Sequence, residues 1–336
     1  MKALVTGGAG FIGSALTDRL LAEAHTVDVV DDLSTGSLAN LASARAGGAR
    51  RLSFQQLDIR SPALAGLLER RRPEVVFHLA AAPAADGSFA DPAADAETDI
   101  VGTLRLLEAC RRHRVGKVVF ASSAAIYGEP DARDLPVRES RAVASPGPWT
   151  PRGAAKRAVG EYLQVYRERY ALEFSVLALA NVYGPGQDPQ RRAGVVGTFA
   201  RRLLAGEECV IDGDGRQTRD FVYIDDAVDA LARAGTRGGG LLINVATGVE
   251  TSINALHGLM AAAVTAHGAL HPAAGDADVD AVADPRPATH GPARPVEPRR
   301  LALDPSRAGI HLGWSPWTAL ADGVDATLAW WRDRTA

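Results

Sequence analysis

The stretch Thr6-Gly7-Gly8-Ala9-Gly10-Phe11-Ile12-Gly13 decides the fold. It follows an apolar run typical of a strand and precedes apolar residues at helical spacing. Gly7 permits a tight turn, Gly10 lets backbone amides approach a pyrophosphate, and Gly13 allows a helix to pack close to the strand. A helix N-terminus also favours negative charge. The stretch therefore predicts a strand, a phosphate-binding turn and a helix.

The same alternation of short apolar runs and helical patterns continues through the first 180 residues. We expect strands at Ala3–Thr6, Thr26–Asp31, Leu52–Leu57, Val75–Leu79, Lys117–Ser122 and Glu173–Leu179, and helices at Phe11–Ala24, Pro62–Arg71, Ala94–Arg112 and Gly153–Tyr170. Such alternation is the mark of βαβ units, and most of these apolar residues are expected to be core. The sequence thus predicts an α/β fold with a Rossmann-type doubly wound parallel sheet over residues 1–180.

The pattern changes after residue 180, where loops, glycine and proline become frequent. Helical spacing returns at Asp225–Arg233, Ile253–Ala266 and Ala319–Trp331, whereas His267–Pro298 is rich in Ala, Asp and Pro with little periodicity. We expect 267–298 to be a long surface loop. Residues 181–336 are expected to form mainly a smaller substrate-binding region, some of whose segments can return to the sheet.

Composition excludes several classes of protein. Of 336 residues 46% are hydrophobic, which allows a sizeable core, and 37 basic and 40 acidic residues give a net charge of -3. The charges are spread along the chain, which argues against nucleic-acid or anionic-membrane binding. Cys110 and Cys209 form neither a disulfide framework nor a metal cluster. The start lacks a signal-peptide core and no stretch is long enough to span a bilayer, so we expect a cytoplasmic protein without a metal.

Asp31 bears on the choice of cofactor. It ends the second expected strand roughly twenty residues after the glycine turn, where a carboxylate binds ribose hydroxyls. A carboxylate there repels the additional phosphate of NADP, so NAD is favoured. The alternative is that Asp31-Asp32 is a surface turn, which applies if the strand is shifted by one residue.

A set of segments in one order resembles the extended short-chain dehydrogenase/reductase family, in its nucleotide-sugar 4-epimerase branch. The segments are TGGAGFIG at 6–13, DDLSTG at 31–36, LDI at 57–59, HLAA at 78–81, VGTLRLLEAC at 101–110, SSAAIYG at 122–128, NVYGPGQDP at 181–189, GDGRQTRDFVYIDD at 213–226, NVATG at 244–248 and LDPSRA at 303–308. The resemblance covers nearly the whole chain and is more specific than any one segment.

The resemblance implies a site for NAD and a site for a nucleotide sugar. The implied NAD-binding residues are Gly7, Gly10, Phe11, Ile12, Gly13, Asp31, Asp32, Leu33, Ser34, Gly36, Asp58, Ile59, Leu79, Ala80, Ala81 and Lys156. The implied substrate residues are Ser123, Asn181, Val195, Val196, Arg219 and Arg294, with a UDP sugar as the expected ligand. It also implies a homodimer formed through Ala94–Arg112 and Gly153–Tyr170.

The sequence differs from the family pattern at the reaction centre. The family has Pro-Tyr-Gly-x-Ser-Lys, in which the tyrosinate takes the hydroxyl proton at C4 of the sugar. This chain has Pro151-Arg152-Gly153-Ala154-Ala155-Lys156, and none of its six tyrosines lies four residues before a lysine. Arginine stays protonated and cannot be a base. Two more departures are Asp99, usually Asn, and Ala178, often Arg.

Three explanations of the missing tyrosine stay open. Asp86, Asp99 or Ser123 could be the base, or Arg152 could stabilise an alkoxide or bind a substrate carboxylate. The third explanation is an impaired protein that binds NAD and a nucleotide sugar without turnover. We expect the catalytic set to be Ser123, Arg152 and Lys156.

The residues after Ser123 bear on the type of reaction. Related dehydratases and decarboxylases place acidic residues there, because elimination needs an additional acid or base. Here they are Ala124 and Ala125. Epimerisation is therefore favoured, and a dehydratase or another NAD-dependent sugar-modifying enzyme is the alternative.

Overall fold

A seven-stranded parallel sheet forms the centre of the protein. The computed structural model describes residues 1–48, 50–82, 89, 91–144, 147, 150–187, 194–270, 288–293 and 298–335. The strands are β1 (Lys2–Thr6), β2 (Thr26–Asp31), β3 (Leu52–Gln56), β4 (Val75–His78), β5 (Lys117–Ser123), β6 (Glu173–Leu179) and β11 (Leu241–Val245). Their order is β11-β6-β5-β4-β1-β2-β3, and every pair is parallel. The order reverses beside β1, where a doubly wound sheet binds its ligand.

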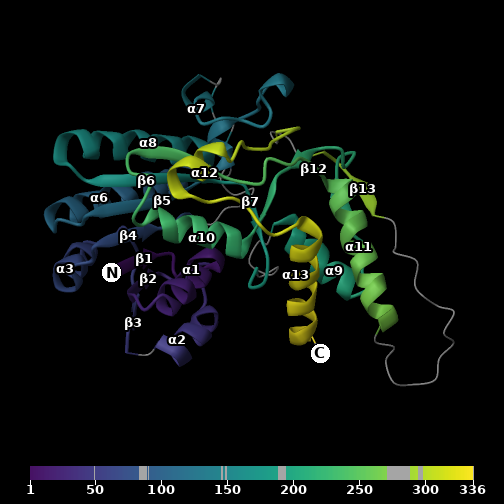
Figure 1. Ribbon diagram of the computed structural model, residues 1–336, viewed down its shortest axis with the longest axis horizontal. Helices are drawn as coiled ribbons and strands as arrows, with labels where there is room; N and C mark the ends of the chain where they lie inside the picture. Colours follow the sequence, from purple (N-terminus) through teal and green to yellow (C-terminus); the bar gives the residue numbers. More distant parts are fainter. Residues whose placement is uncertain are drawn as a thin grey trace.

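Helices cover both faces of this sheet (Figure 1). On one face lie α3 (Ala63–Arg71), α6 (Thr103–Arg112) and α8 (Pro151–Tyr170), and on the other α1 (Phe11–Ala22), α2 (Ala42–Gly48), α10 (Ile224–Ala234) and α12 (Ser306–Leu312). Successive residues of a strand point to opposite faces, so β5 gives Val118 and Phe120 to one core and Val119 to the other. The strands are therefore apolar on both faces, as a parallel sheet between helices requires.

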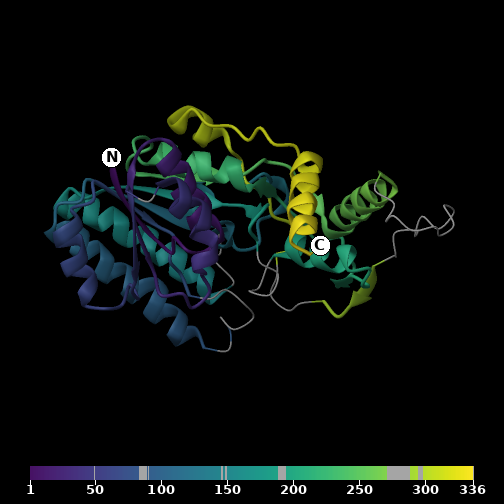
Figure 2. The ribbon, with the colours of Figure 1, turned by 90° about the horizontal axis from the view of Figure 1, so that it is seen from below.

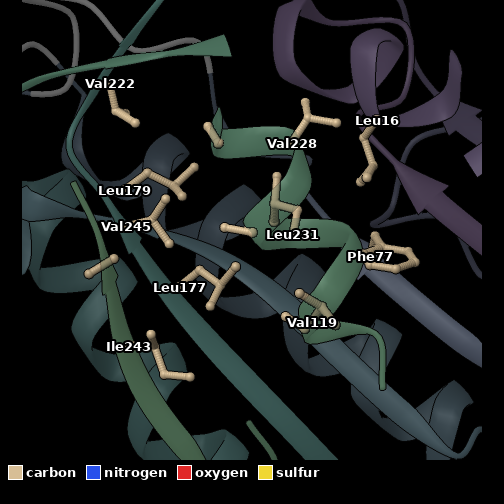
Figure 3. Packing of buried hydrophobic residues seen from close by; sticks show 14 of the residues in the cluster. Leu16, Phe77, Val119, Leu177, Leu179, Val222, Val228, Leu231, Ile243 and Val245 are labelled. Atoms are coloured by element: carbon tan, nitrogen blue, oxygen red, sulfur yellow. The ribbon is translucent and has the colours of Figure 1, made fainter. Parts of the chain in front are cut away.

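The core beneath α10 joins the two halves of the sequence (Figure 3). Val228 and Leu231 of α10 belong to one cluster with Leu177 of β6 and Val119 of β5, and Leu16 of α1 lies next to Val228. These side chains are at most 3% exposed. The sheet is therefore completed and covered by residues that follow position 180.

The remaining C-terminal residues form a smaller region at one end of the sheet (Figure 2). Its helices are α9 (Val195–Leu204), α11 (Ile253–Leu270) and α13 (Leu320–Thr335), and its strands are β7 (Asn181–Tyr183), β8 (Val210–Asp212), β9 (Thr218–Arg219), β10 (Phe221–Tyr223), β12 (Thr251–Ser252) and β13 (Thr289–Gly291). They share a third core cluster, which contains Phe199, Leu256 and Leu328. Short helical segments η1 (Leu38–Leu41), η3 (Ala124–Tyr127), η4 (Ala132–Asp134) and α7 (Arg141–Ala144) lie in the connections.

The predicted α/β fold is confirmed, and the six predicted strands agree with the structure to within one residue at each end. The seventh strand of the sheet, β11, was not predicted. Two further details differ. The helix expected at Ala94–Arg112 is divided into α5 (Pro92–Ala96), a π-helical segment η2 (Glu97–Gly102) and α6. The loop expected at 267–298 contains the end of α11 and the strand β13, and its residues 271–287 and 294–297 lie outside the described part. No helix in the described part is long and apolar enough to cross a membrane.

Candidate functional site

The glycine turn joins β1 to α1 and leaves no room for side chains. Gly7 has φ +68°, and a Cβ added there would lie 2.7 Å from the backbone nitrogen of Ala80. A Cβ at Gly13 would collide with the carbonyl oxygen of Gly7. Because the backbone is bare here and α1 begins at Phe11, a phosphate can reach the amides at the helix N-terminus.

Asp31 lies at the end of β2 and is 7% exposed. Its Oδ2 accepts a hydrogen bond from the Ala9 amide at 2.9 Å, and its Oδ1 accepts one from the Leu33 amide at 2.8 Å. Burial raises the pKa of the carboxyl, and these two bonds oppose the rise. A carboxylate oxygen has two acceptor sites, so Asp31 can still accept from ribose hydroxyls.

One cavity of about 330 Å³ lies over this turn. Twelve of the sequence-predicted residues line it, namely Gly7, Gly10, Phe11, Asp31, Asp32, Ser34, Asp58, Ile59, Leu79, Ala80, Ala81 and Arg152. The lining also contains Val30, Thr35, Asn40, Leu57, Ala82, Thr98, Gly186 and Gln187, which the sequence analysis did not assign to the site. Ile12, Gly13, Leu33, Gly36 and Lys156 are not in this lining.

The lining residues that the sequence analysis missed come mostly from loops, whose paths the sequence pattern does not reveal. Asn40 lies in η1, which follows the turn after β2, and its side-chain amide donates to the Ala9 carbonyl at 2.8 Å. Gly186 and Gln187 reach the cavity from beyond β7. Thr35 lies within the DDLSTG segment, and this segment could have indicated that Thr35 belongs to the NAD site.

Asp58 stands on the wall formed by the loop after β3. Arg60 donates to both of its carboxylate oxygens, from Nε at 3.1 and 3.0 Å and from Nη2 at 2.6 Å. The hydrogen bond from the Arg60 side chain is the main reason why the pKa of Asp58 is lowered. Asp58 is therefore a fixed anion at the edge of the cavity.

Arg152 and Lys156 lie on the first two turns of α8. Thr150 caps this helix by accepting from the Gly153 amide at 3.0 Å, and Pro151 occupies its first position. Arg152 lines the cavity and donates from Nη1 to the Ala82 carbonyl at 3.0 Å. A cation in the first turn is unfavourable beside the positive end of the helix dipole, so the preferences of the helix itself do not explain this arginine.

Lys156 is 4% exposed, and its Nζ lies 4.6 Å from the centroid of the Phe120 ring. The pKa of Lys156 is lowered to about 8, mainly by burial; the charge of Asp99 opposes this shift, and the charge of Arg152 adds to it. Lys156 is thus a buried cation whose charge depends on its neighbours.

Ser123 ends β5 and caps η3 by accepting a hydrogen bond from the Ala125 amide at 3.2 Å.

Tyr127, which lies in η3, cannot replace the missing tyrosine as a base. Its hydroxyl donates to Asn244 at 2.6 Å, and burial raises the pKa of this tyrosine well above its ordinary value. Of the two carboxylates considered as bases, Asp99 is buried and Asp86 lies outside the described residues.

Apart from Ser123, the described substrate residues that the resemblance implies belong to the smaller region, and they do not line the cavity. Asn181 begins β7 and is exposed, while Val195 and Val196 open α9. Arg219 donates from Nη1 to the Thr218 carbonyl at 2.8 Å and to the Pro298 carbonyl at 2.7 Å. Arg294 lies outside the described residues. The binding roles of these residues remain predictions.

Cys110 and Cys209 are both buried and free. Within the described ranges, no group of three His, Cys, Asp or Glu side chains is placed to hold a metal ion.

Comparison with known proteins finds relatives that match this chain along its whole length. The model of the NAD-dependent epimerase/dehydratase family matches residues 3–246. The chain is 45% identical to UDP-glucose 4-epimerase of Mycolicibacterium smegmatis over 341 residues, which covers 100% of both chains. It superposes on UDP-glucose 4-epimerase of Thermotoga maritima, solved with UDP-glucose, with a TM-score of 0.88 at 37% identity and full coverage of both chains. The Thermus thermophilus UDP-glucose 4-epimerase, solved with NAD, gives 0.85 at 34% identity, with 99% of each chain covered.

Proposed function

Because the chain belongs to the NAD-dependent epimerase/dehydratase family, we propose that it is a cytoplasmic nucleotide-sugar 4-epimerase that acts on a UDP sugar. One observation supports the proposal most: one cavity lies over the glycine turn, lined by Gly7, Gly10 and Asp31, and Arg152 of α8 reaches the same cavity. The two Ala residues after Ser123 favour epimerisation over dehydration, because they provide no additional acid or base.

The residues around the cavity fit NAD. Gly7 and Gly10 would leave the amides open to the pyrophosphate, Asp31 would accept from the adenosine ribose, and Lys156 would donate to the nicotinamide ribose. When bound, NAD supplies the group that accepts a hydride from the sugar and returns it. The carboxylate of Asp31 favours NAD over NADP through repulsion of an additional phosphate.

In the proposed reaction centre, Arg152 takes the position that a tyrosine has in the resembling enzymes. It cannot accept the C4 proton, but its planar guanidinium can stabilise an alkoxide or bind a carboxylate on the sugar. One N–H donates to Ala82, and among the described residues its other N–H groups have no acceptor within hydrogen-bonding distance. Ser123 would hold the reacting hydroxyl, and its proton would pass to one of the two carboxylates considered as the base, Asp86 or Asp99.

The test is a comparison of the parent protein with Arg152→Tyr. An active role of Arg152 predicts that the variant loses 4-epimerisation of UDP-glucose at least about tenfold. A large gain would instead identify an impaired centre in which the tyrosine is missing. Activity is followed by the interconversion of UDP-glucose and UDP-galactose.

Calorimetric titration separates the enzyme from a protein that only binds NAD. The proposed function predicts that the parent binds both NAD and a UDP sugar. Binding of NAD without any affinity for UDP sugars would contradict it, and protein that neither carries nor takes up NAD would remove its basis.

We also propose that two copies associate through α6 and α8. The outer face of α8 exposes the large apolar side chains Tyr162, Val165 and Tyr170. Several exposed large apolar side chains on one helix are typical of protein interfaces. We expect Val165→Asp to convert a dimer into a monomer in sedimentation experiments, whereas Ile310→Asp, on the distant helix α12, should not. A parent protein that sediments as a monomer would refute this pairing.

A further inference from the structure

Asp99 is an unusual buried carboxylate close to the reaction centre. It lies in the π-helical segment η2 and is 2% exposed. Its Oδ1 accepts from the Ala82 amide at 2.6 Å, while its Oδ2 is buried and has no hydrogen-bond partner among the described residues. A half-satisfied buried carboxylate is costly, so its presence calls for a compensating charge or a role.

One peptide group connects Asp99 to Arg152. The N–H of Ala82 donates to Asp99, and the carbonyl of the same residue accepts from Arg152 at 3.0 Å. An anion at the donor end and a cation at the acceptor end polarise hydrogen bonds in the same direction, which strengthens both in a dry environment. The position of the guanidinium is therefore coupled to the charge of Asp99.

Asp99 is also the negative charge that favours protonated Lys156. Lys156 and Arg152 are cations four residues apart on one helix, a spacing at which like charges repel. The titratable groups that couple to Lys156 are Asp99 from η2, Arg152 from α8 and His78 from β4. His78 stays neutral because burial lowers its pKa to about 3. Asp99 thus acts on Lys156 through its charge and on Arg152 through the Ala82 peptide.

The backbone around Asp99 is held by a chain of side chains that leads to β1. The Thr103 hydroxyl donates to the Asp99 carbonyl at 2.7 Å and lies 2.8 Å from His78 Nε2. His78 Nδ1 in turn lies 2.7 Å from the Thr6 hydroxyl. A π-helical turn is rare and is often found at functional sites, and here it is anchored to the strand that carries the glycine turn.

We propose that Asp99 is a positioning residue that allows Arg152 and Lys156 to coexist as cations at the reaction centre, through the Ala82 peptide and through its own charge. The inference rests on the proposed function, in which Arg152 takes the tyrosine position. In this proposal Asp99 and Arg152, two of the residues that depart from the family pattern, depend on each other. With a tyrosine at position 152, the same carboxylate would instead oppose formation of the tyrosinate.

The first experiment measures Lys156 directly, by NMR of the lysine ammonium groups in the full chain. The chain has three lysines, so Lys2→Arg and Lys117→Arg assign the signals. Asp99→Asn keeps an acceptor for the Ala82 amide and removes the charge, so the pKa of Lys156 should fall by about one pH unit. Asp95→Asn removes another buried carboxylate, on α5, and should leave it unchanged. A pKa of Lys156 that is the same in Asp99→Asn and the parent would overturn the proposal.

The second experiment compares the parent, Asp99→Asn, Arg152→Tyr and the double variant. We expect Asp99→Asn to lower kcat at least about tenfold when residue 152 is Arg and to raise kcat when residue 152 is Tyr. Equal effects in both backgrounds would refute the link between Asp99 and Arg152. Should all four proteins be inactive, the proposed function fails, and the NMR titration still decides the role of Asp99.

Discussion

At the scale of single residues, charge buried beside the cavity is the main feature of this protein. Lys156 is a cation with a depressed pKa, and burial is the largest cause. Natural proteins keep such a group where function requires it, at a cost in stability. The lysine and the glycine turn could be recognised from the sequence, because motif and spacing place them. The charge coupling of Asp99 could not, since it depends on contacts between η2 and α8.

We expect Lys156→Met to stabilise the fold and abolish activity. Because the pKa of Lys156 stays below its ordinary value even with Asp99 nearby, the buried charge costs free energy at pH 7, and the variant should gain about 2 kcal/mol in the free energy of unfolding, as measured by urea denaturation. Lys2→Met, at an exposed position, should change it by less than about 0.5 kcal/mol. A clear loss of stability in Lys156→Met would contradict this prediction, because it would show that neighbouring groups outweigh the cost of burying the ammonium group.

The same lysine predicts a pH dependence of stability. Its pKa is about 8 in the folded chain and 10.5 in the unfolded chain, so the unfolded chain binds more protons between these values. The free energy of unfolding should therefore rise with pH between about 8 and 10.5, and the destabilisation is fully present below 8. Subtracting the Lys156→Met curve from that of the parent isolates this contribution. A difference that does not vary over this pH range would contradict the assignment.

At the scale of elements, the turn between β1 and α1 is the part that the sequence determines most strictly. A Cβ at Gly13 has no space beside the Gly7 carbonyl. We expect Gly13→Ala to displace α1 and to weaken NAD binding by at least about tenfold in calorimetry.

An exposed helical glycine provides the matched control for Gly13→Ala. Gly258 lies within α11, and an added Cβ meets nothing within 4 Å. Gly258→Ala should therefore leave NAD affinity unchanged and stabilise the protein by about 0.5 to 1 kcal/mol. Unaltered NAD binding in Gly13→Ala would show that the turn tolerates a wider separation from α1.

The elements also show where sequence periodicity reaches its limit. It predicted six of the seven strands of the main sheet and the long helices, because parallel strands between helices are apolar on both faces. It gave one helix at 94–112, because the apolar spacing continues through η2 and the wider π-helical turn leaves little trace in composition. The contributions of Asn40 and Gln187 to the cavity depend on how loops return to it, and local patterns do not encode this.

At the scale of the whole molecule, Asp220 connects segments that are distant in the sequence. It lies between β9 and β10 and is 2% exposed. Its Oδ1 accepts from the amide and hydroxyl of Thr247, and its Oδ2 accepts from the amides of Gly248 and Leu303. One carboxylate thus holds together the end of β11, the approach to α12 and the smaller region.

Asp220→Asn tests this connection. The amide nitrogen of asparagine cannot accept, so two buried donors lose their partner and the free energy of unfolding should fall by about 2 kcal/mol or more. Asp325→Asn, on the exposed face of α13, should change it by less than about 0.5 kcal/mol. Thermal unfolding of both variants provides the measurement, and equal midpoints would refute the role of Asp220.

The position of β11 at the end of the sheet has a consequence for how the chain acquires its structure during synthesis. β11 pairs with β6 along its full length, and its last residue is Val245. A nascent chain that ends at residue 180 would therefore expose β6 as an unpaired, apolar edge strand. Such an edge strand can pair with other chains and cause aggregation. Productive folding has to wait until the ribosome has released β11, so premature termination before that point should yield aggregates rather than a smaller nucleotide-binding protein.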